Sequence, residues 1–363
     1  MFFRLPTELY CRKDCVKAHA ADIAAFGNKA YIITGKGSSK KNGSLNDITD
    51  VLKSNNIDYI IFDRVEENPS VANIMDAATI GRDFRPDFII GIGGGSPLDA
   101  SKAISLMVRN SEADESLLLT GGSYGYLPVI TVPTTCGTGS EITPYSILTL
   151  HAQKTKSSIP HKIYPSLALC DPGYLSSAPV SVIRNTAVDA LGHLIESYIN
   201  SKATPVSRMF ADTGLSHWNN IAAFIENDSY TDEQYEELLI TSSFAGMAIS
   251  HTGTSLPHRM SYHFTYTRGI PHGKAVGAFL SAYTAHASDV DRTHVLTMLG
   301  MGSCEELGEL IKRLTGTITM DSKELDGCID YVLSNKSKLA NCPYRVDRDI
   351  AADIYVKSLI MQS

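Results

Sequence analysis

The sequence predicts an α/β N-terminal domain with a mainly parallel, Rossmann-like sheet, followed by an all-α C-terminal domain. In the first half of the chain, short apolar runs rich in β-branched residues alternate with stretches of helical periodicity, which is typical of strands covered by helices on both faces. After about residue 175 the apolar residues follow helical spacing alone. We therefore expect a boundary after the turn Asp171-Pro172-Gly173, with an α/β domain over 1–173 and a helical domain over 174–363.

The individual elements follow from these patterns in order. The β-rich runs predict strands at 29–34, 59–62, 88–92, 129–133 and 167–170. Apolar residues at helical spacing predict intervening helices at 45–52 and 71–80, and a further helix that opens at Pro97. In the second domain we expect helices at 182–199, 207–226, 232–248, 275–285 and 304–314, and no strand.

Composition and charge narrow the class of protein. The formal net charge is -7 over 363 residues, which argues against nucleic acid as a partner. No apolar run approaches the roughly 18 residues of a membrane helix, and the first residues lack the apolar core of a secretion signal. The seven cysteines are scattered and form no CxxC pair, which is typical of reduced thiols. We therefore expect a cytoplasmic protein with no membrane partner.

A glycine-rich turn, Gly93-Gly94-Gly95-Ser96, follows the expected strand at 88–92 and precedes the helix that Pro97 opens. Proline suits the first helical turn. Glycines let the backbone approach a phosphate, and a helix N-terminus supplies free N–H groups. A tight turn without a ligand explains the same residues about equally well. The turn is not the GxGxxG fingerprint, so it does not by itself predict a standard dinucleotide site.

Small hydroxyl residues and glycines fill the segment 133–141, which follows the expected strand at 129–133. Such residues at the carboxyl end of a parallel strand suit a crevice that binds a ligand. For any single threonine in this segment, a hydroxyl that caps the local backbone is the simpler interpretation.

Candidate metal ligands lie in the second domain. Asp189 and His193 are four residues apart, so a helix places them on one face. His258 and His272 follow later in the chain. One carboxylate and three imidazoles suit a divalent ion such as iron or zinc. Each histidine taken alone is more simply a satisfied polar residue, and chain spacing does not bring His258 to Asp189.

Together these segments resemble the iron-containing (group III) alcohol dehydrogenase family, through most of the chain. The motifs that carry the resemblance, in this order, are 93–102, 133–141, 189–193 and the histidine pair at 258 and 272. Within the family, segments 143–148 and 35–43 resemble the branch described as 1,3-propanediol-dehydrogenase-like. The resemblance implies a cofactor-binding α/β domain, a helical metal-binding catalytic domain and a homodimer.

The resemblance also implies roles for particular residues. One divalent ion, Fe²⁺ or Zn²⁺, is expected on Asp189, His193, His258 and His272. Cofactor contacts are expected at Gly94, Gly95, Ser96, Asp99, Thr134, Thr135, Thr138 and Lys154. Many members carry a second histidine four residues after the third ligand, beside the nicotinamide. Here that position is Tyr262, followed by His263, and both are candidates for the proton route.

The implied function is a metal-dependent oxidoreductase that interconverts a small primary alcohol or diol and its aldehyde by hydride transfer with NAD(P)(H). NAD-selective enzymes commonly place a carboxylate after the strand that leads to the adenosine ribose. Here the segment after Thr34 is Gly35-Lys36-Gly37-Ser38-Ser39-Lys40, without an acid. Ser38, Ser39 and Lys40 suit a 2′-phosphate, so we predict NADP in preference to NAD, although a solvated basic turn is nearly as good an interpretation.

Four other functions compete with this interpretation. Glycerol dehydrogenases and dehydroquinate synthases resemble the same fold more remotely, and a non-catalytic metal-binding protein is a different class. Arg259 and His263 share one helical face, and Arg268 and Lys274 lie nearby in the chain. These basic residues suggest a reductase of a short anionic aldehyde, of the sulfo- or phosphonoacetaldehyde type. Since adjacent helical residues diverge by about 100°, Arg259 is more simply expected to point away from a metal that His258 binds.

Overall fold

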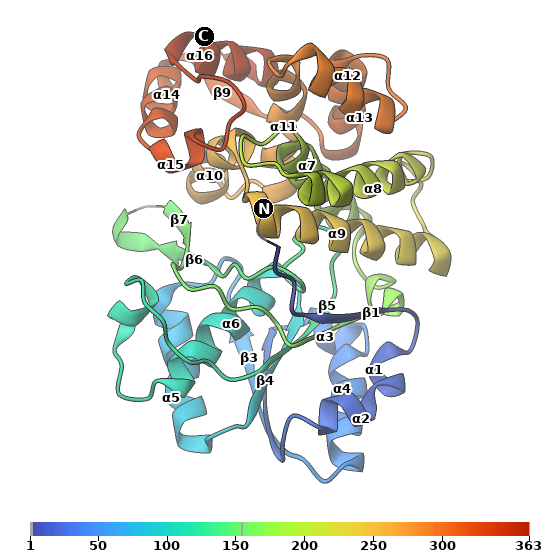
Figure 1. Cartoon of the computed structure of the whole chain (residues 1–363), viewed down its shortest axis with the longest axis vertical. Coiled ribbons are helices and arrows are strands. Elements are labelled where there is room, and N and C mark those ends of the chain that lie inside the picture. Colours follow the sequence, from blue (N-terminus) through green and yellow to red (C-terminus); the bar gives the residue numbers. More distant parts are fainter. Residues whose placement is uncertain (1–2, 154, 363) are drawn as a thin grey trace. The chain divides into compact units, whose positions relative to one another are not determined.

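The computed structural model describes residues 3–153 and 155–362, and the chain forms two compact units (Figure 1). The sheet unit holds Leu5–Pro179 together with Thr231–Leu239. The helical unit holds residues 3–4, Val180–Tyr230 and the chain from Ile240 through its last described element.

A parallel sheet forms the centre of the sheet unit. Among the described residues it has six strands in the order β1-β8-β5-β4-β2-β3, and every paired strand is parallel. The bounds are β1 Glu8–Cys11, β2 Lys29–Gly35, β3 Asp58–Val65, β4 Phe88–Gly93, β5 Val129–Pro133 and β8 Leu167–Cys170. The five strands predicted from sequence are therefore confirmed. Sequence analysis missed the edge strand β1 and the antiparallel hairpin of β6 Ile147–Leu150 and β7 Thr155–Ser158.

Helices cover both faces of this sheet because alternate residues of each strand point to opposite faces. On β2, Tyr31 and Ile33 pack into one apolar cluster with residues of α5 (Val71–Phe84) and α6 (Gly95–Arg109). Ala30 and Ile32 pack into the other cluster with residues of α4 (Ser44–Ser54). The helices of this unit are α1 Cys15–Ala18, α2 Ala20–Ala24, α3 Ser38–Lys41, α4 Ser44–Ser54, α5 Val71–Phe84 and α6 Gly95–Arg109. Short 3-10 helices lie at Glu115–Leu118, His151–Gln153 and Pro172–Leu175.

The helical unit contains the remaining helices. They are α7 Val180–Tyr198, α8 Pro205–Ala222, α9 Asp232–Thr252, α10 Leu256–Arg268, α11 His272–Ala285, α12 Asp289–Met298, α13 Cys304–Thr315, α14 Leu325–Leu333, α15 Lys336–Leu339 and α16 Arg348–Ser358. The first residues of α9 belong to the sheet unit. The five helices expected here are confirmed, with ends shifted by a few residues.

The expectation of an all-α second domain needs one correction. β9 Thr319–Asp321 and β10 Ile360–Gln362 form a small parallel pair, and a 3-10 helix follows β9 at Ser322–Glu324. Strands of three residues are too short to show the alternation that predicts a strand from sequence. The unit is therefore largely helical rather than entirely so.

Close contact between α7 and α11 organises the middle of the helical unit. A Cβ atom added to Gly273 would lie 1.7 Å from the carbonyl oxygen of Asn185, and one added to Gly277 would lie 2.4 Å from Val188 Cγ1. From the other helix, a Cβ on Gly192 would lie 2.7 Å from Val276 Cγ1. Glycine at these positions therefore lets the two helix backbones approach more closely than larger residues would allow.

No helix of the described chain combines the length and the apolar character needed to cross a membrane.

Candidate functional site

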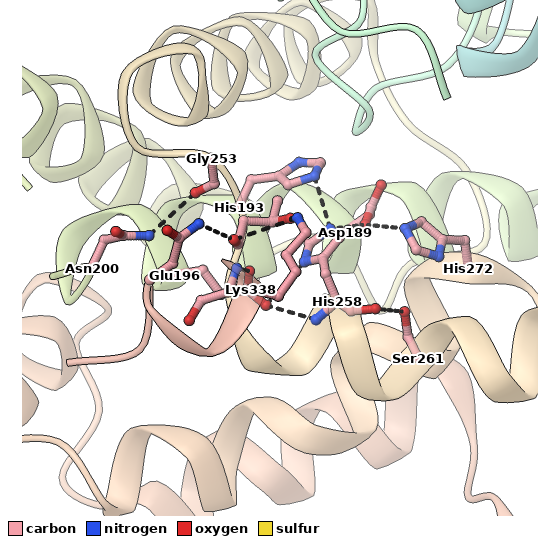
Figure 2. Close-up of polar contacts among 12 residues, drawn as sticks. Asp189, His193, Glu196, Asn200, Gly253, His258, Ser261, His272 and Lys338 are labelled. Atoms are coloured by element: carbon pink, nitrogen blue, oxygen red, sulfur yellow. Dashed lines mark hydrogen bonds and ion pairs between the residues drawn. The ribbon is translucent and has the colours of Figure 1, made fainter. Parts of the chain in front are cut away.

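One face of α7 carries three buried polar side chains, Asp189, His193 and Glu196 (Figure 2). They stand at positions i, i+4 and i+7, so successive helical turns stack them along a single stripe. His258 lies in the first turn of α10, and His272 is the first residue of α11. The close packing of α11 on α7 brings the start of α11 to this stripe.

The polar atoms of these residues converge. Asp189 Oδ1 lies 3.6 Å from His258 Nε2 and 3.8 Å from His272 Nε2, and these three residues form a group whose ligand atoms all lie within 4.8 Å of one another. The Nε2 atom of His193 lies 3.0 Å from that of His258. The structure thus brings together all four side chains that the sequence singled out as metal ligands.

The donor set fits a divalent metal ion. Asp189 Oδ1 is buried, and no group in the described part of the chain donates a hydrogen bond to it. A buried carboxylate oxygen without a donor is costly unless a cation satisfies it. Two ligands that lie about 2.1 Å from one tetrahedral ion stand roughly 3.4 Å apart, which is close to the observed separations. A carboxylate with imidazoles suits Fe²⁺ or Zn²⁺.

The electrostatics of the cluster agree with this interpretation. Burial by itself would raise the pKa of the Asp189 carboxyl, but the surrounding histidines hold it below its usual range. Burial would lower the pKa of His258, but the nearby carboxylates of Glu196 and Asp189 raise it to about 9. The carboxylates of Asp189 and Glu196 therefore favour positive charge at this site.

Sequence analysis missed Glu196. Its side chain is fully buried, and its Oε1 atom accepts hydrogen bonds from the backbone N–H (3.0 Å) and from Nδ1 (2.9 Å) of His258. Its Oε2 atom accepts from the backbone N–H of Ser255 at 2.5 Å. The signal that would have found it is the seven-residue spacing from Asp189, which places an acidic residue on an otherwise buried helical face.

The two candidates for the proton route lie differently. The Tyr262 ring is buried and stacks against the His272 ring at 5.9 Å between centroids. His263 is half-buried, and its ring lies 6.1 Å from that of Tyr331 in α14. Burial raises the pKa of the Tyr262 hydroxyl and lowers that of the His263 imidazole.

Arg259 does not join the metal ligands. Its guanidinium stands over the Tyr331 ring, 3.6 Å from the centroid. It also donates hydrogen bonds to the Tyr331 carbonyl and, at 3.2 Å, to the Ser334 hydroxyl. Arg268 donates to the Thr319 carbonyl at 2.6 Å. These contacts agree with the simpler expectation that Arg259 points away from the ligand cluster.

In the sheet unit, threonines cover the glycine-rich turn at the start of α6. A Cβ on Gly94 would lie 3.2 Å from Thr135 Cγ2, and a Cβ on Gly95 would lie 2.8 Å from Thr138 Cγ2. The backbone N–H of Thr134 donates to the Gly93 carbonyl at 2.9 Å. The turn and the segment after β5, both expected to contact the cofactor, therefore lie side by side.

Two of the expected cofactor residues make contacts within the protein. The Ser96 hydroxyl accepts a hydrogen bond from the Asn68 N–H at 3.0 Å. The buried Asp99 carboxylate accepts from the Ser140 hydroxyl and, at 2.9 Å, from the Ile147 N–H. Lys154, another expected cofactor contact, lies outside the described residues.

The segment after β2 holds the residues expected at a 2′-phosphate. Ser39 is buried, and its hydroxyl is hydrogen-bonded to that of Thr34 at 2.8 Å. Ser38 and Lys40 are exposed. Lys40 Nζ lies 2.6 Å from Asp63 Oδ2 on β3. The segment itself contains no acid, and the neighbouring strand β3, which pairs with β2, supplies one.

Comparisons with known proteins agree over both units. The family described as "Iron-containing alcohol dehydrogenase" matches residues 6–172, and that described as "Fe-containing alcohol dehydrogenase family, C-terminal" matches residues 183–328. The solved structure of the iron-containing alcohol dehydrogenase from Thermotoga maritima is similar with a TM-score of 0.91 and 33% identity, and the match covers 99% of each chain.

Two curated proteins are similar at lower identity. The NADPH-dependent butanol dehydrogenase of Clostridium saccharobutylicum is 26% identical over 345 residues, which cover 93% of this chain and 84% of that protein. The 1,3-propanediol dehydrogenase of Citrobacter freundii is 29% identical over 312 residues, which cover 82% of this chain and 76% of that protein.

Proposed function

The chain belongs to the iron-containing alcohol dehydrogenase family, and we propose that it interconverts a small primary alcohol or diol and the corresponding aldehyde. The hydride passes to or from NAD(P)(H). The proposal rests on the convergence of Asp189, His258 and His272, whose ligand atoms lie within 4.8 Å of one another. The buried Oδ1 atom of Asp189 accepts no hydrogen bond from the described residues. We add His193 as a fourth ligand, since its Nε2 atom lies 3.0 Å from that of His258.

The chain's own residues supply charge and geometry for this reaction. A bound divalent ion supplies a Lewis acid for the substrate oxygen. The Asp189 carboxylate and the three imidazoles hold that ion through side chains that helix packing keeps in place. Burial raises the pKa of the Tyr262 hydroxyl, so this group can serve as a hydrogen-bond donor at neutral pH.

We assign cofactor binding to the sheet unit. The backbone N–H groups at the start of α6 suit a pyrophosphate, and Gly94 and Gly95 leave room for its approach beside Thr135 and Thr138. Because the Asp99 carboxylate already accepts hydrogen bonds from Ser140 and Ile147, we assign it to holding α6 in place.

We propose that NADP(H) is preferred over NAD(H), with Ser38 and Lys40 at the 2′-phosphate. The Asp63 carboxylate competes for Lys40, so the preference should be modest. Asp63→Asn should raise kcat/KM with NADPH by about two- to fivefold, the range of an exposed ion pair, and leave the value with NADH unchanged. A wild-type enzyme that clearly prefers NADH would contradict this assignment.

The substrate is tested with a panel of short aldehydes, neutral and anionic, assayed with both cofactors. The protein is first depleted of metal and then reloaded with Fe²⁺ or Zn²⁺. We expect turnover of neutral aldehydes and 1,3-diols, as the name of the Citrobacter relative suggests. Because Arg259 is held by Tyr331 and Ser334, we expect no preference for an anionic analogue.

The metal ligands are tested by His272→Ala, with His286→Ala as the control. His286 lies at the other end of α11, is half-buried and pairs with Asp353 at 2.7 Å, away from the ligand cluster. His272→Ala should lose bound metal and activity together, and His286→Ala should keep both. Full activity in a metal-depleted His272→Ala protein would defeat the proposal.

Light scattering tests the proposed homodimer, and a monomer in solution would contradict it.

A further inference from the structure

We propose that Glu196 is a positioning residue that fixes the imidazole of His258 with its Nε2 atom facing the other ligands. The inference rests on the proposed function, because it concerns how the metal site is held in shape. Glu196 lies one helical turn beyond His193 on α7 and reaches to the start of α10 (Figure 2). It is fully buried, and it is not itself a member of the ligand cluster.

The hydrogen bonds of Glu196 hold His258 at two points. Its Oε1 atom accepts from the backbone N–H of His258 at 3.0 Å and from the ring Nδ1 at 2.9 Å. A single carboxylate oxygen therefore fixes both the backbone and the ring of the same residue. Rotation of the imidazole about its side-chain torsions would break the ring contact and leave a buried carboxylate oxygen poorly satisfied, which is unfavourable.

The second oxygen of Glu196 anchors the helix that carries His258. Ser255 precedes α10, and in the described chain its side chain does not cap the helix. The Oε2 atom of Glu196 accepts the Ser255 N–H at 2.5 Å. Glu196 thus accepts from the backbone N–H groups of Ser255, the N-cap residue, and of His258, the third residue of α10. These are the two positions whose N–H groups a capping box satisfies. Here the acceptor comes from another helix, so the cap also ties α10 to α7.

This arrangement determines which ring nitrogen faces the ligands. A carboxylate only accepts hydrogen bonds, so Nδ1 of His258 carries the hydrogen and donates it to Glu196. The Nε2 atom then points toward Asp189 Oδ1 at 3.6 Å and His193 Nε2 at 3.0 Å. Carboxylates in this relation to a ligating histidine fix its tautomer and ring orientation. Thus α7 supplies two ligands directly and orients a third through Glu196.

The experiment compares the full-length wild type with Glu196→Gln and Thr204→Ala. Zn²⁺ affinity is measured by competition between the metal-depleted protein and a chromogenic chelator. Glutamine has nearly the same shape as glutamate, but its NH₂ group must face either the Ser255 N–H or His258. We expect Glu196→Gln to weaken Zn²⁺ binding by about 10- to 100-fold.

Thr204→Ala is the matched control for loss of a helix cap. Thr204 caps α8 in the same unit by accepting the Ser207 N–H at 3.2 Å. This variant should lower the unfolding temperature and leave Zn²⁺ affinity unchanged. If Glu196→Gln does not fold, Glu196→Asp replaces it. Aspartate keeps the charge, but its shorter side chain does not reach Ser255 and the His258 ring together, so the same loss of affinity is expected.

A second readout does not depend on metal. In ¹⁵N-resolved spectra, the wild type should show a slowly exchanging Nδ1–H signal from His258, both with Zn²⁺ and without it, and Glu196→Gln should lose it. A folded Glu196→Gln protein that keeps this signal, or that binds Zn²⁺ within twofold of wild type, overturns the inference. If the wild type binds no Zn²⁺, the proposed metal function fails, while the His258 signal still decides the role of Glu196.

Discussion

Replacing Gly273 by alanine tests the contact that brings His272 to the ligand cluster. The added Cβ would lie 1.7 Å from the carbonyl oxygen of Asn185 and 2.6 Å from its carbonyl carbon. Both atoms belong to the backbone of α7, so no side-chain rotation relieves the overlap. An ordinary contact between carbon and a carbonyl oxygen is about 3.3 Å, so the start of α11 must retreat from α7 by roughly 1.6 Å.

The size of this retreat predicts the effect on metal binding. His272 immediately precedes Gly273 and moves with it, and its Nε2 atom starts 3.8 Å from Asp189 Oδ1. The retreat would open this separation to roughly 5 Å, whereas two ligands of one ion stand at most about 4.4 Å apart. Loss of even an outer partner of a ligand typically costs about 10- to 100-fold in metal affinity, so displacement of a ligand itself should lower the Zn²⁺ affinity by at least about 100-fold. Overpacking should also lower the free energy of unfolding by about 1–3 kcal/mol.

Two measurements check the prediction for Gly273→Ala. Chelator competition gives the Zn²⁺ affinity, and thermal unfolding of the metal-depleted protein gives the stability. Gly327→Ala is the control, because a Cβ at this position in α14 meets no described atom within 4 Å apart from its chain neighbours and the backbone of its own helix. That control should gain about 0.5–1 kcal/mol of stability and bind Zn²⁺ as wild type does. Wild-type affinity together with a wild-type unfolding temperature in Gly273→Ala would refute the reasoning.

Three further predictions concern other parts of the chain. Gly95→Ala brings a Cβ within 2.8 Å of Thr138 Cγ2, so the KM for NADPH should rise about tenfold, while the Zn²⁺ affinity should not change. An unchanged KM would argue against a cofactor at this turn. Arg259→Met loses the contact with Tyr331 and should lower the free energy of unfolding by about 1–2 kcal/mol. The ratio of kcat/KM for sulfonated and neutral aldehydes should stay constant, and a changed ratio would indicate an anion pocket. Burial lowers the pKa of Lys102 from 10.5 to about 8, so the folded chain loses this proton before the unfolded chain does. The free energy of unfolding of the wild type, measured relative to that of Lys102→Met, should therefore rise between pH 8 and 10.5, by at most on the order of 3 kcal/mol. Denaturant titrations at several pH values measure this difference. A difference that stays flat or falls would contradict the burial of this amine.

Local patterns in the sequence were enough to predict most of the fold. Runs such as Phe88–Ile92 are continuous and β-branched because β4 is buried on both faces, and this signal does not depend on distant residues. The i, i+4 spacing of Asp189 and His193 is equally local, since any helix places such a pair on one face. Elements without such a pattern were missed: the edge strand β1, the hairpin of β6 and β7, the three-residue strands β9 and β10, and helices such as α12, α14 and α16.

Long-range contacts that leave no mark in chain spacing were decided only by the tertiary structure. His258 and His272 lie far along the chain from Asp189, and their convergence depends on how α10 and α11 pack against α7. The pairing of Lys40 with Asp63 depends in the same way on the register of neighbouring strands. The sequence by itself determined the elements and the chemical types of the ligands, because periodicity and residue identity are local properties. Which side chains meet, and through which atoms, depended on packing between elements distant in the chain.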